Sequence, residues 1–288
     1  VARCASGIIL TDASITAHIA ILTRSLAIPT IMVNTTAVTH IRDGTRILMD
    51  ANQGNIFVEP DEGIIANYSS LLEAGTAQPA PVEVQAETFS RDGVRIRLLA
   101  NINLLSDLHL ARKFKAEGIG LYRTEFPFII RNDFPSEEEQ YNIYRKLVEE
   151  MAGKEVVFRT LDIGGDKLLA YFENYTETNP FLGLRAIRFS LRNRQLFTQQ
   201  LRALMCATRG LQLKIMFPMV GSVDDFLLIR EIVAKCSAEL TAESVPHNNA
   251  PQLGIMIEVP SAVEVIEEIA DLADFVSLGT NDLVQYIL

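Results

Sequence analysis

The 288-residue chain has only three cysteines, and none of them forms a CxxC pair. Cys4, Cys206 and Cys236 are odd in number and widely spaced, so we expect reduced thiols. No apolar run approaches the roughly 18 residues that a membrane-spanning helix needs, and the first residues lack a signal-peptide pattern. These absences predict a soluble protein of the cytoplasm without a membrane partner.

Positive charge is also scarce. The chain has 26 Lys and Arg against 36 Asp and Glu, a net charge of −10, which argues against a nucleic-acid partner bound through a general basic surface. Nucleotide-binding fingerprints are missing as well. Gly118-Ile119-Gly120 lacks the third glycine of GxGxxG, and Gly164-Gly165-Asp166-Lys167 is not a Walker A loop. An anionic ligand must therefore find local positive charge.

The length favours one large domain plus a smaller one. The chain opens on Val1 instead of methionine and stops at Leu288, directly after a group of polar residues at a strand end. We therefore expect a fragment at both ends.

Residues 1–59 have the pattern of a small α/β unit. One helix is expected at Ile19–Leu26, and four strands at Gly7–Leu10, Thr30–Val33, Arg46–Met49 and Asn55–Val58. Residues 60–92 are rich in Glu, Ala, Pro, Ser and Gly, which favours a helix followed by an extended linker.

Residues 93–288 alternate strand-like runs with helices. Six strands are predicted, at Ile96–Asn101, Gly118–Tyr122, Glu155–Phe158, Gln212–Met216, Leu253–Ile257 and Phe275–Leu278, with a weaker candidate at Pro180–Leu184. Capping boxes mark helix starts at Ser136 with Glu139, Ser222 with Asp225 and Ser261 with Glu264. This alternation predicts a parallel sheet, and the number of units favours an incomplete (β/α)₈ TIM-type barrel over an open doubly wound sheet.

Four of these apolar runs end in charged or polar residues that a plain strand does not need. Arg123 and Arg159 follow two of them, Glu258 follows a third, and Gly279-Thr280-Asn281-Asp282 follows the fourth. Ligands bind at the carboxyl ends of strands in parallel sheets. Because arginine pairs suit a phosphate and carboxylates suit a divalent metal, these positions predict a site for both.

Two further segments bring charge to the same strand ends. The run from Arg159 to Lys167 places two cations and two carboxylates around a glycine turn, and the run from Asn179 to Arg188 adds two more arginines. Taken singly, such residues more often lie in solvated loops or form structural ion pairs than belong to a site. Their convergence at strand ends favours a functional site.

Among the four histidines, His18 has the most distinctive surroundings. A polar turn leads into an apolar helical run, with Thr16 placed as the N-cap. The free N–H groups and dipole of a first helical turn would favour a phosphoryl group on this ring by roughly 1 kcal/mol or more. A surface histidine beside a helix start is the alternative, and it is our interpretation of His40, His109 and His247.

Together these segments resemble the phosphoenolpyruvate-utilising enzymes, and most closely the enzyme I branch of the bacterial phosphotransferase system. Seven segments follow the family's order, namely residues 11–29 with the histidine, Gly118–Phe126, Arg159–Lys167, Asn179–Arg188, Met216–Met219, Gly254–Glu258 and Gly279–Asp282. Residues 160–167 and 185–188 favour this branch over the pyruvate phosphate dikinases, which rank second.

The resemblance implies a role for His18 and for each domain. His18 corresponds to the histidine that takes the phosphoryl group from phosphoenolpyruvate and passes it to a histidine phosphocarrier protein, yielding pyruvate. Residues 1–59 would be a partial phosphohistidine swivelling domain, residues 60–92 a linker, and residues 93–288 a truncated phosphoenolpyruvate-binding barrel. A homodimer formed through the barrel is also implied.

The other candidates are implied to form one pocket. They are Arg123 and Arg159 for the phosphate, Glu258 and Asp282 for Mg²⁺, and Asn281, Asp282, Lys167, Asp162 and Arg185 for further substrate contacts. A substrate with a phosphate and a carboxylate carries about three negative charges when fully ionised, and arginines plus Mg²⁺ would offset them.

The chain departs from the family in three ways. Ala13-Ser14 stands where two glycines are usual, and Ala17 replaces a serine beside the histidine. The domain that binds the phosphocarrier would precede Val1, and a further arginine and the cysteine that protonates the enolate would follow Leu288. We therefore expect incomplete activity from this chain alone. A decayed regulatory module that senses phosphoenolpyruvate is the alternative, but the expected arginines and metal ligands within this span are present.

Overall fold

The computed structural model describes residues 5–11, 23, 28–75, 85, 87–129, 133–151, 153–164 and 183–288. The chain divides into two compact units, Val1–Gln85 and Ala86–Leu288. His18, Lys167 and the predicted N-cap Thr16 lie outside the described residues, as does most of the predicted helix around them. In the part of the chain that is described, no helix has both the length and the apolar character needed to cross a membrane.

The first unit contains two small sheets. β1 (Ile8–Leu10) pairs in parallel with β2 (Thr30–Met32), and β3 (Ile47–Asp50) pairs antiparallel with β4 (Asn55–Val58). Helices α2 (Thr35–Val38) and α3 (Glu62–Gly75) complete its described part. Each strand lies within about one residue of its predicted bounds, and α3 confirms the helix expected at the start of the linker.

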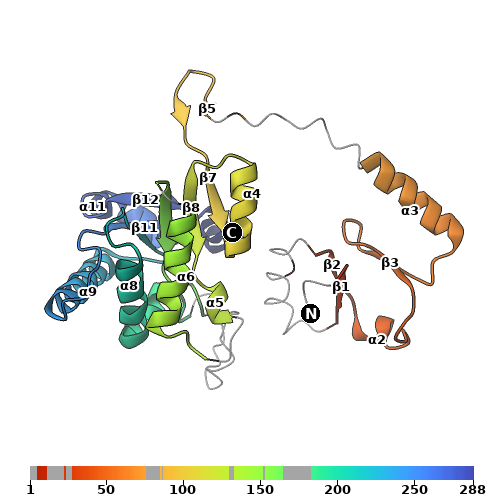
Figure 1. Ribbon diagram of the computed structural model, residues 1–288, viewed down its shortest axis with the longest axis horizontal. Helices are drawn as coiled ribbons and strands as arrows, with labels where there is room; N and C mark the ends of the chain where they lie inside the picture. The colour runs from red at the N-terminus through yellow and green to blue at the C-terminus, as the bar shows by residue number, and fades with distance from the viewer. Residues whose placement is uncertain are drawn as a thin grey trace. The chain divides into compact units, whose positions relative to one another are not determined.

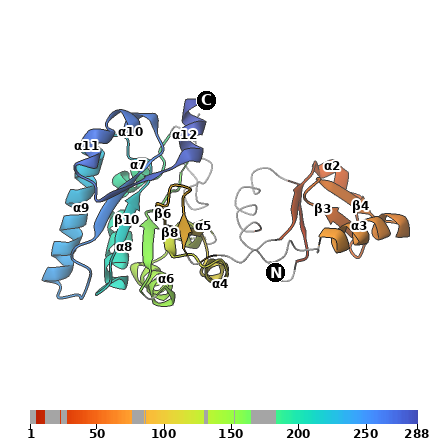
Figure 2. The same ribbon diagram turned by 90° about the horizontal axis from the view of Figure 1, so that it is seen from above.

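The second unit is built on a six-stranded parallel sheet with the order β12-β11-β10-β9-β8-β7. Its strands are β7 (Leu99–Ile102), β8 (Gly118–Arg123), β9 (Glu155–Arg159), β10 (Lys214–Phe217), β11 (Gln252–Ile257) and β12 (Phe275–Leu278). Each strand pairs with the one before it, so right-handed crossovers place their helices on one side and the sheet curls into a half-barrel (Figure 2). The predicted parallel α/β architecture is confirmed.

Helices α6 (Glu137–Glu150), α8 (Arg194–Ala207) and α9 (Val223–Ala242) lie side by side against the outer face of this sheet (Figure 1). The shorter helices are η2 (Leu105–Asp107), α4 (Leu108–Lys113), α5 (Phe126–Ile129), α7 (Ile187–Arg192), α10 (Pro260–Glu264), α11 (Ile266–Ala270) and α12 (Thr280–Ile287). Several of them follow a strand directly, which places their first turns at the carboxyl edge of the sheet.

Successive strand residues contribute to two different cores, as the pleat of a strand requires. Phe158 and Ile215 belong to the main core, which is shared with helix residues such as Leu204. Their neighbours Val157 and Met216 belong to a small cluster on the inner face of the half-barrel. The helices therefore bury the outer face, while the inner face is free to line a pocket.

One predicted strand is wrong in its extent. The run Ile96–Asn101 divides into β6 (Arg95–Ile96), which pairs antiparallel with β5 (Thr88–Phe89), and β7, which belongs to the sheet. The cause is a tight turn before β6, in which Gly93 has a φ of +83° and the Ser90 N–H donates to Val94 O at 2.8 Å. A left-handed residue of this kind closes hairpins, so part of the expected linker is a hairpin.

Two helix starts confirm their capping residues and one does not. Ser136 Oγ accepts from Glu139 N at 3.2 Å while Glu139 accepts from Ser136 N, and Ser222 Oγ accepts from Asp225 N at 3.1 Å. The Ser261 prediction is wrong, because α10 begins at Pro260, whose fixed φ and missing N–H suit a first helical position.

The weaker strand candidate at Pro180–Leu184 is not confirmed where it is described. Gly183 and Leu184 form a bend, and the next residue, Arg185, makes an isolated antiparallel bridge with Gly164. The rest of that candidate lies outside the described residues.

We predict that Ser136→Ala lowers the free energy of unfolding by about 1 kcal/mol, because the Glu139 N–H in the first turn of α6 loses its side-chain acceptor. Ser261→Ala is the matched control and should leave stability nearly unchanged, since Ser261 does not cap α10. Urea unfolding followed by circular dichroism measures both, and equal effects would contradict the capping assignment.

Candidate active site

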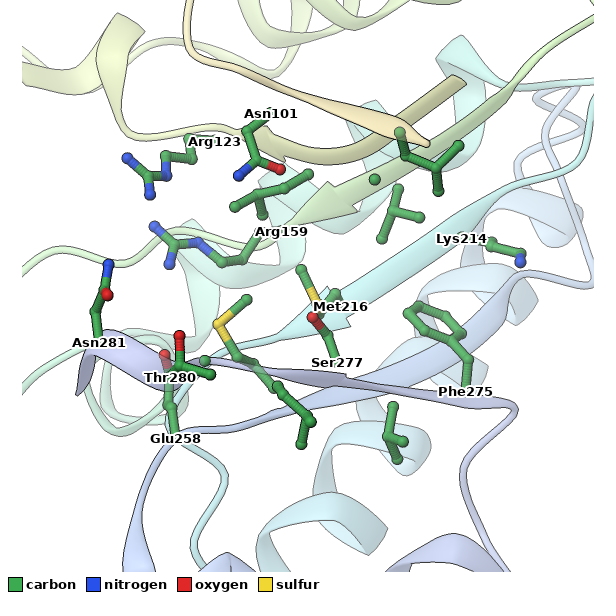
Figure 3. A pocket seen from close by; sticks show the side chains of 18 of the residues that line it. Asn101, Arg123, Arg159, Lys214, Met216, Glu258, Phe275, Ser277, Thr280 and Asn281 are labelled. Atoms are coloured by element: carbon green, nitrogen blue, oxygen red, sulfur yellow. The ribbon is translucent and has the colours of Figure 1, made fainter. Parts of the chain in front are cut away.

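The two predicted arginines lie next to each other at the carboxyl edge of the sheet. Arg123 is the last residue of β8 and Arg159 the last residue of β9, and the two are partners in the strand register. Figure 3 shows both guanidinium groups extending toward the same end of a pocket. Parallel strands in register bring their ends together, which is why the sequence pattern predicted this pair.

This pocket has a volume of about 670 Å³ and occupies the inner face of the half-barrel. The end of the pocket at the carboxyl edge of the sheet is lined by the arginine pair together with Asn101, Glu258, Thr280, Asn281 and Asp282. Lys214 and Phe275 lie at the opposite end in Figure 3, beyond Met216. Of the residues predicted to converge, Arg123, Arg159, Glu258, Asn281 and Asp282 therefore lie at one end of a cavity with an apolar floor.

Arg159 is held rigidly, whereas Arg123 is not. Arg159 Nη2 lies 2.5 Å from Glu125 Oε1 and 3.2 Å from Asp162 Oδ2, and all three side chains are buried. Burial alone would lower the pKa of Arg159, but the charges of Glu125 and Asp162 raise it, so the side chain stays cationic. Arg123 is exposed and has no ion-pair or hydrogen-bond partner among the described residues.

Arg185 joins this group to the first turn of α12. Its Nε and Nη2 donate to the two carboxylate oxygens of Asp162 at 3.0 and 3.3 Å, and its Nη1 lies 2.9 Å from Asp282 Oδ1. Bidentate geometry of this kind fixes orientation as well as distance. Arg185 therefore contacts the pocket through Asp282, and it is not itself among the pocket-lining residues.

Glu258 follows β11 directly and is fully buried. One carboxylate oxygen, Oε1, accepts from Met219 N at 2.7 Å, while Oε2 has no hydrogen-bond partner among the described residues. Burial, together with the nearby charge of Asp162, raises the pKa of Glu258 to about 7, and Arg159 opposes the shift. Gly279 allows this closeness, because a Cβ there would lie 2.8 Å from Oε2.

The carboxylates at the strand-end side of the pocket favour binding of a cation. Among the described residues at the strand-end side of the pocket, three arginines lie with four carboxylates, namely Arg123, Arg159 and Arg185 with Glu125, Asp162, Glu258 and Asp282, whereas Arg97 and Lys214 pair with Glu155 elsewhere in its lining. A buried carboxylate oxygen without a partner suits a hard cation, which removes the cost of leaving that oxygen unpaired. Among the described residues, no three His, Cys, Asp or Glu side chains cluster closely enough to hold a metal by themselves.

Two residues of the site were given no role by the sequence reasoning. Asn101 lines the pocket near the end of β7, and a polar residue at a strand end is the signal that identified Arg123. Glu125 was part of a recognised motif, but its contact with Arg159 joins residues 34 positions apart, and no local pattern predicts such a contact.

The fold and the site define an α/β half-barrel with a charged pocket at the carboxyl edge of its strands. Residues 79–288 match the profile described as PEP-utilising enzyme, PEP-binding domain, and residues 1–54 match that of the PEP-utilising enzyme, mobile domain. The chain therefore belongs to the PEP-utilising enzymes.

Curated relatives named phosphoenolpyruvate-protein phosphotransferase align with almost the whole chain. The relative from Listeria innocua is 42% identical over 275 residues, and that from Staphylococcus aureus is 41% identical over 275 residues. Each alignment covers 95% of this chain and 48% of the relative, so the chain spans about half the length of the relatives it matches.

We predict that Asp162→Asn lowers the free energy of unfolding by about 3–5 kcal/mol, because two buried arginines lose a shared counter-charge. Glu149→Gln is the control, since Glu149 pairs with Arg145 on the exposed side of α6 and should cost less than about 1 kcal/mol. Chemical denaturation compares the two, and similar losses would refute the coupling of the buried pairs.

Proposed function

We propose that the chain carries the substrate site of a phosphoenolpyruvate-dependent protein phosphotransferase. The observation that carries this proposal is the arginine pair at neighbouring strand ends, in a pocket that also contains Glu258. Arg159 Nε and Glu258 Oε2 are both buried without a partner among the described residues. A ligand that supplies an acceptor for Arg159 Nε and a cation or donor for Glu258 Oε2 would satisfy both atoms. The family and the names of the relatives support the same substrate.

Arg123 and Arg159 would bind the phosphate, and Asn281 would contact the remainder of the substrate. The two arginines would play different parts, because Arg159 is fixed before binding and the exposed Arg123 is free to close on the ligand. Fixed donors that face developing charge on the equatorial phosphate oxygens lower the barrier, since little reorganisation is needed during the reaction.

Glu258 and Asp282 would hold Mg²⁺, the cation expected with this substrate. Both carboxylates line the pocket, and the charge of Asp282 contributes to the raised pKa of Glu258, which places the two within electrostatic reach. Bound Mg²⁺ would neutralise phosphate charge in the transition state. Two protein carboxylates are enough, because Mg²⁺ usually keeps several waters and takes substrate oxygens as ligands.

His18 would be the nucleophile. A ring nitrogen would bond to the phosphorus as the bond between phosphorus and the enol oxygen breaks, and the enolate released would take a proton to give pyruvate. The phosphoryl group would then pass to a histidine phosphocarrier protein. Lys167 would be a further substrate contact, and Arg185 would act through Asp282.

The domain roles follow from this chemistry. Residues 1–59 would form part of a swivelling domain that brings His18 to the pocket, residues 60–92 would be the linker, and residues 93–288 would form part of a (β/α)₈ barrel. A cytoplasmic homodimer formed through the barrel would be the working assembly. The intact arginine pair and Glu258 favour catalysis over a decayed sensor, and the relatives named above favour the phosphotransferase over the dikinase.

We predict that the full-length protein becomes phosphorylated on His18 when given phosphoenolpyruvate and Mg²⁺. The modification should be labile in acid and stable in alkali, as a phosphoramidate is, and His18→Ala should abolish it. His40→Ala is the control and should retain the label, because His40 is an exposed residue with no assigned role. Radiolabelled phosphoenolpyruvate followed by peptide mapping measures the outcome, and label that persists in His18→Ala would sink the assignment.

The metal assignment predicts that Mg²⁺ binds weakly alone and more tightly with phosphoenolpyruvate, since the substrate supplies ligands. Glu258→Gln should raise the Mg²⁺ concentration needed for half-maximal phosphorylation by about 10- to 100-fold or more, because loss of a residue that merely supports a metal ligand already costs that much. Glu264→Gln, on the exposed side of α10, is the control. Titration calorimetry and initial rates test this, and an unchanged Mg²⁺ dependence in Glu258→Gln would contradict it.

A further inference from the structure

Glu125 occupies a central position in the site without touching the pocket. It lies in the turn between β8 and α5, is buried, and does not line the cavity. Its Oε1 atom accepts from Arg159 Nη2 at 2.5 Å and from the backbone N–H of Asp162 at 3.2 Å. One carboxylate oxygen therefore holds both the side chain that ends β9 and the turn that follows this strand.

These contacts determine which part of the Arg159 guanidinium remains available. The group is planar, so fixing Nη2 on Glu125 fixes the direction of the other donors. Arg159 Nε is buried and has no partner among the described residues, although Arg159 lines the pocket. Arg123 has no such restraint in the described structure. Of the pair, Arg159 is therefore the member whose orientation is set in advance.

A polar network fixes the Glu125 turn from the helix side of the sheet. Thr124 Oγ1 donates to the backbone carbonyl of Arg159 at 2.9 Å and accepts from Gln200 Nε2 at 3.1 Å. Gln200 Oε1 accepts from the backbone N–H of Leu161 at 3.0 Å. Helix α8, through Gln200, thus restrains Thr124 after β8 and Leu161 after β9, and the backbone of Arg159 is held as well as its side chain.

A purely stabilising role explains this arrangement poorly. Taking charged groups out of water is costly, and apolar replacements of a buried ion pair are often as stable or more so. Orientation of a charged group that must meet a ligand is a function that apolar residues cannot supply. The contacts of Glu125 converge on Arg159, which among the described arginines is the one that combines a fixed orientation with an unpaired buried donor.

We propose that Glu125 is a positioning residue of the site, which orients Arg159 toward the phosphate of the ligand with Thr124 and Gln200 as its support. The inference rests on the proposed function for the identity of the substrate. The ability of Arg159 to bind a phosphate group does not depend on the proposed function. Phosphate binding and turnover of phosphoenolpyruvate are therefore measured separately.

The first measurement is the affinity of the full-length protein for inorganic phosphate in the presence of Mg²⁺, by titration calorimetry. Glu125→Gln keeps the shape and removes the charge, and Glu125→Asp keeps the charge and shortens the arm. Both should weaken phosphate binding by about tenfold or more, equivalent to about 1.4 kcal/mol, because Arg159 loses the partner that orients it. Circular dichroism establishes that each variant is folded.

The second measurement is turnover of phosphoenolpyruvate. Glu125→Gln should lower kcat/KM by about 10²-fold, with part of the loss in kcat, because a misplaced donor fails the transition state as well as the bound substrate. Glu243→Gln is the matched control, since Glu243 forms an ion pair with Arg202 on the outer helices and should keep the wild-type kcat and KM.

A second variant, Thr124→Val, keeps the inference testable if Glu125→Gln does not fold, because valine has nearly the same shape as threonine. Thr124→Val removes only the hydroxyl that donates to the Arg159 carbonyl, and should weaken phosphate binding less than Glu125→Gln does. If Glu125→Gln does not fold, the phosphate affinity of Thr124→Val tests the inference instead. Weakened binding then supports the positioning role, and wild-type affinity overturns it.

The outcomes separate the two proposals. Folded Glu125→Gln with wild-type or tighter phosphate affinity overturns the positioning role, even if the wild-type protein turns over phosphoenolpyruvate. Wild-type protein that binds phosphate but does not turn over phosphoenolpyruvate overturns the proposed function, and weakened phosphate binding in Glu125→Gln would still support the positioning role. Wild-type protein that binds neither ligand overturns both.

Discussion

A continuous chain of ion pairs joins elements that are far apart in the sequence and makes one site of them. Arg159 at the end of β9 pairs with Glu125 after β8 and with Asp162, and Arg185 pairs with both Asp162 and Asp282 in α12. Opposite charges alternate along this chain, so its three inner members, Arg159, Asp162 and Arg185, each have a counter-charge on both sides. The order of the strands brings these residues to one edge, and the ion pairs then fix their orientation.

This arrangement gives the pocket a fixed part and an open part. Arg159 and Asp282 are restrained by partners, whereas Arg123 is exposed and Glu258 keeps one buried oxygen unpaired. Preorganised donors favour a developing anion, and the unpaired oxygen favours a cation. A ligand that brings phosphate together with Mg²⁺ satisfies both needs, which is why the proposed substrate fits the charge pattern of the pocket better than a simple anion does.

The sequence predicted those parts of the structure that depend on local patterns. Apolar runs that end in charge placed Arg123, Arg159 and Glu258 at the carboxyl edge, because parallel strands all present that end together. It did not predict the role of Glu125, since the 34-residue separation of its partner leaves no local signal. The Gly93 hairpin was missed although Asp92-Gly93 is a strong turn signal, because its surroundings read as linker. Local capping rules also misplaced the start of α10, where Pro260 outweighs Ser261.

The most direct test of the account is an experimental structure of the full-length protein with phosphoenolpyruvate and Mg²⁺ bound. In that structure the phosphate should lie against Arg123 and Arg159, with Arg159 Nε donating to it while Nη2 keeps its bond to Glu125. The cation should lie on Glu258 Oε2 and Asp282. Phosphoenolpyruvate bound away from the carboxyl edge of the sheet, or Arg159 turned from Glu125 to meet it, would contradict the account.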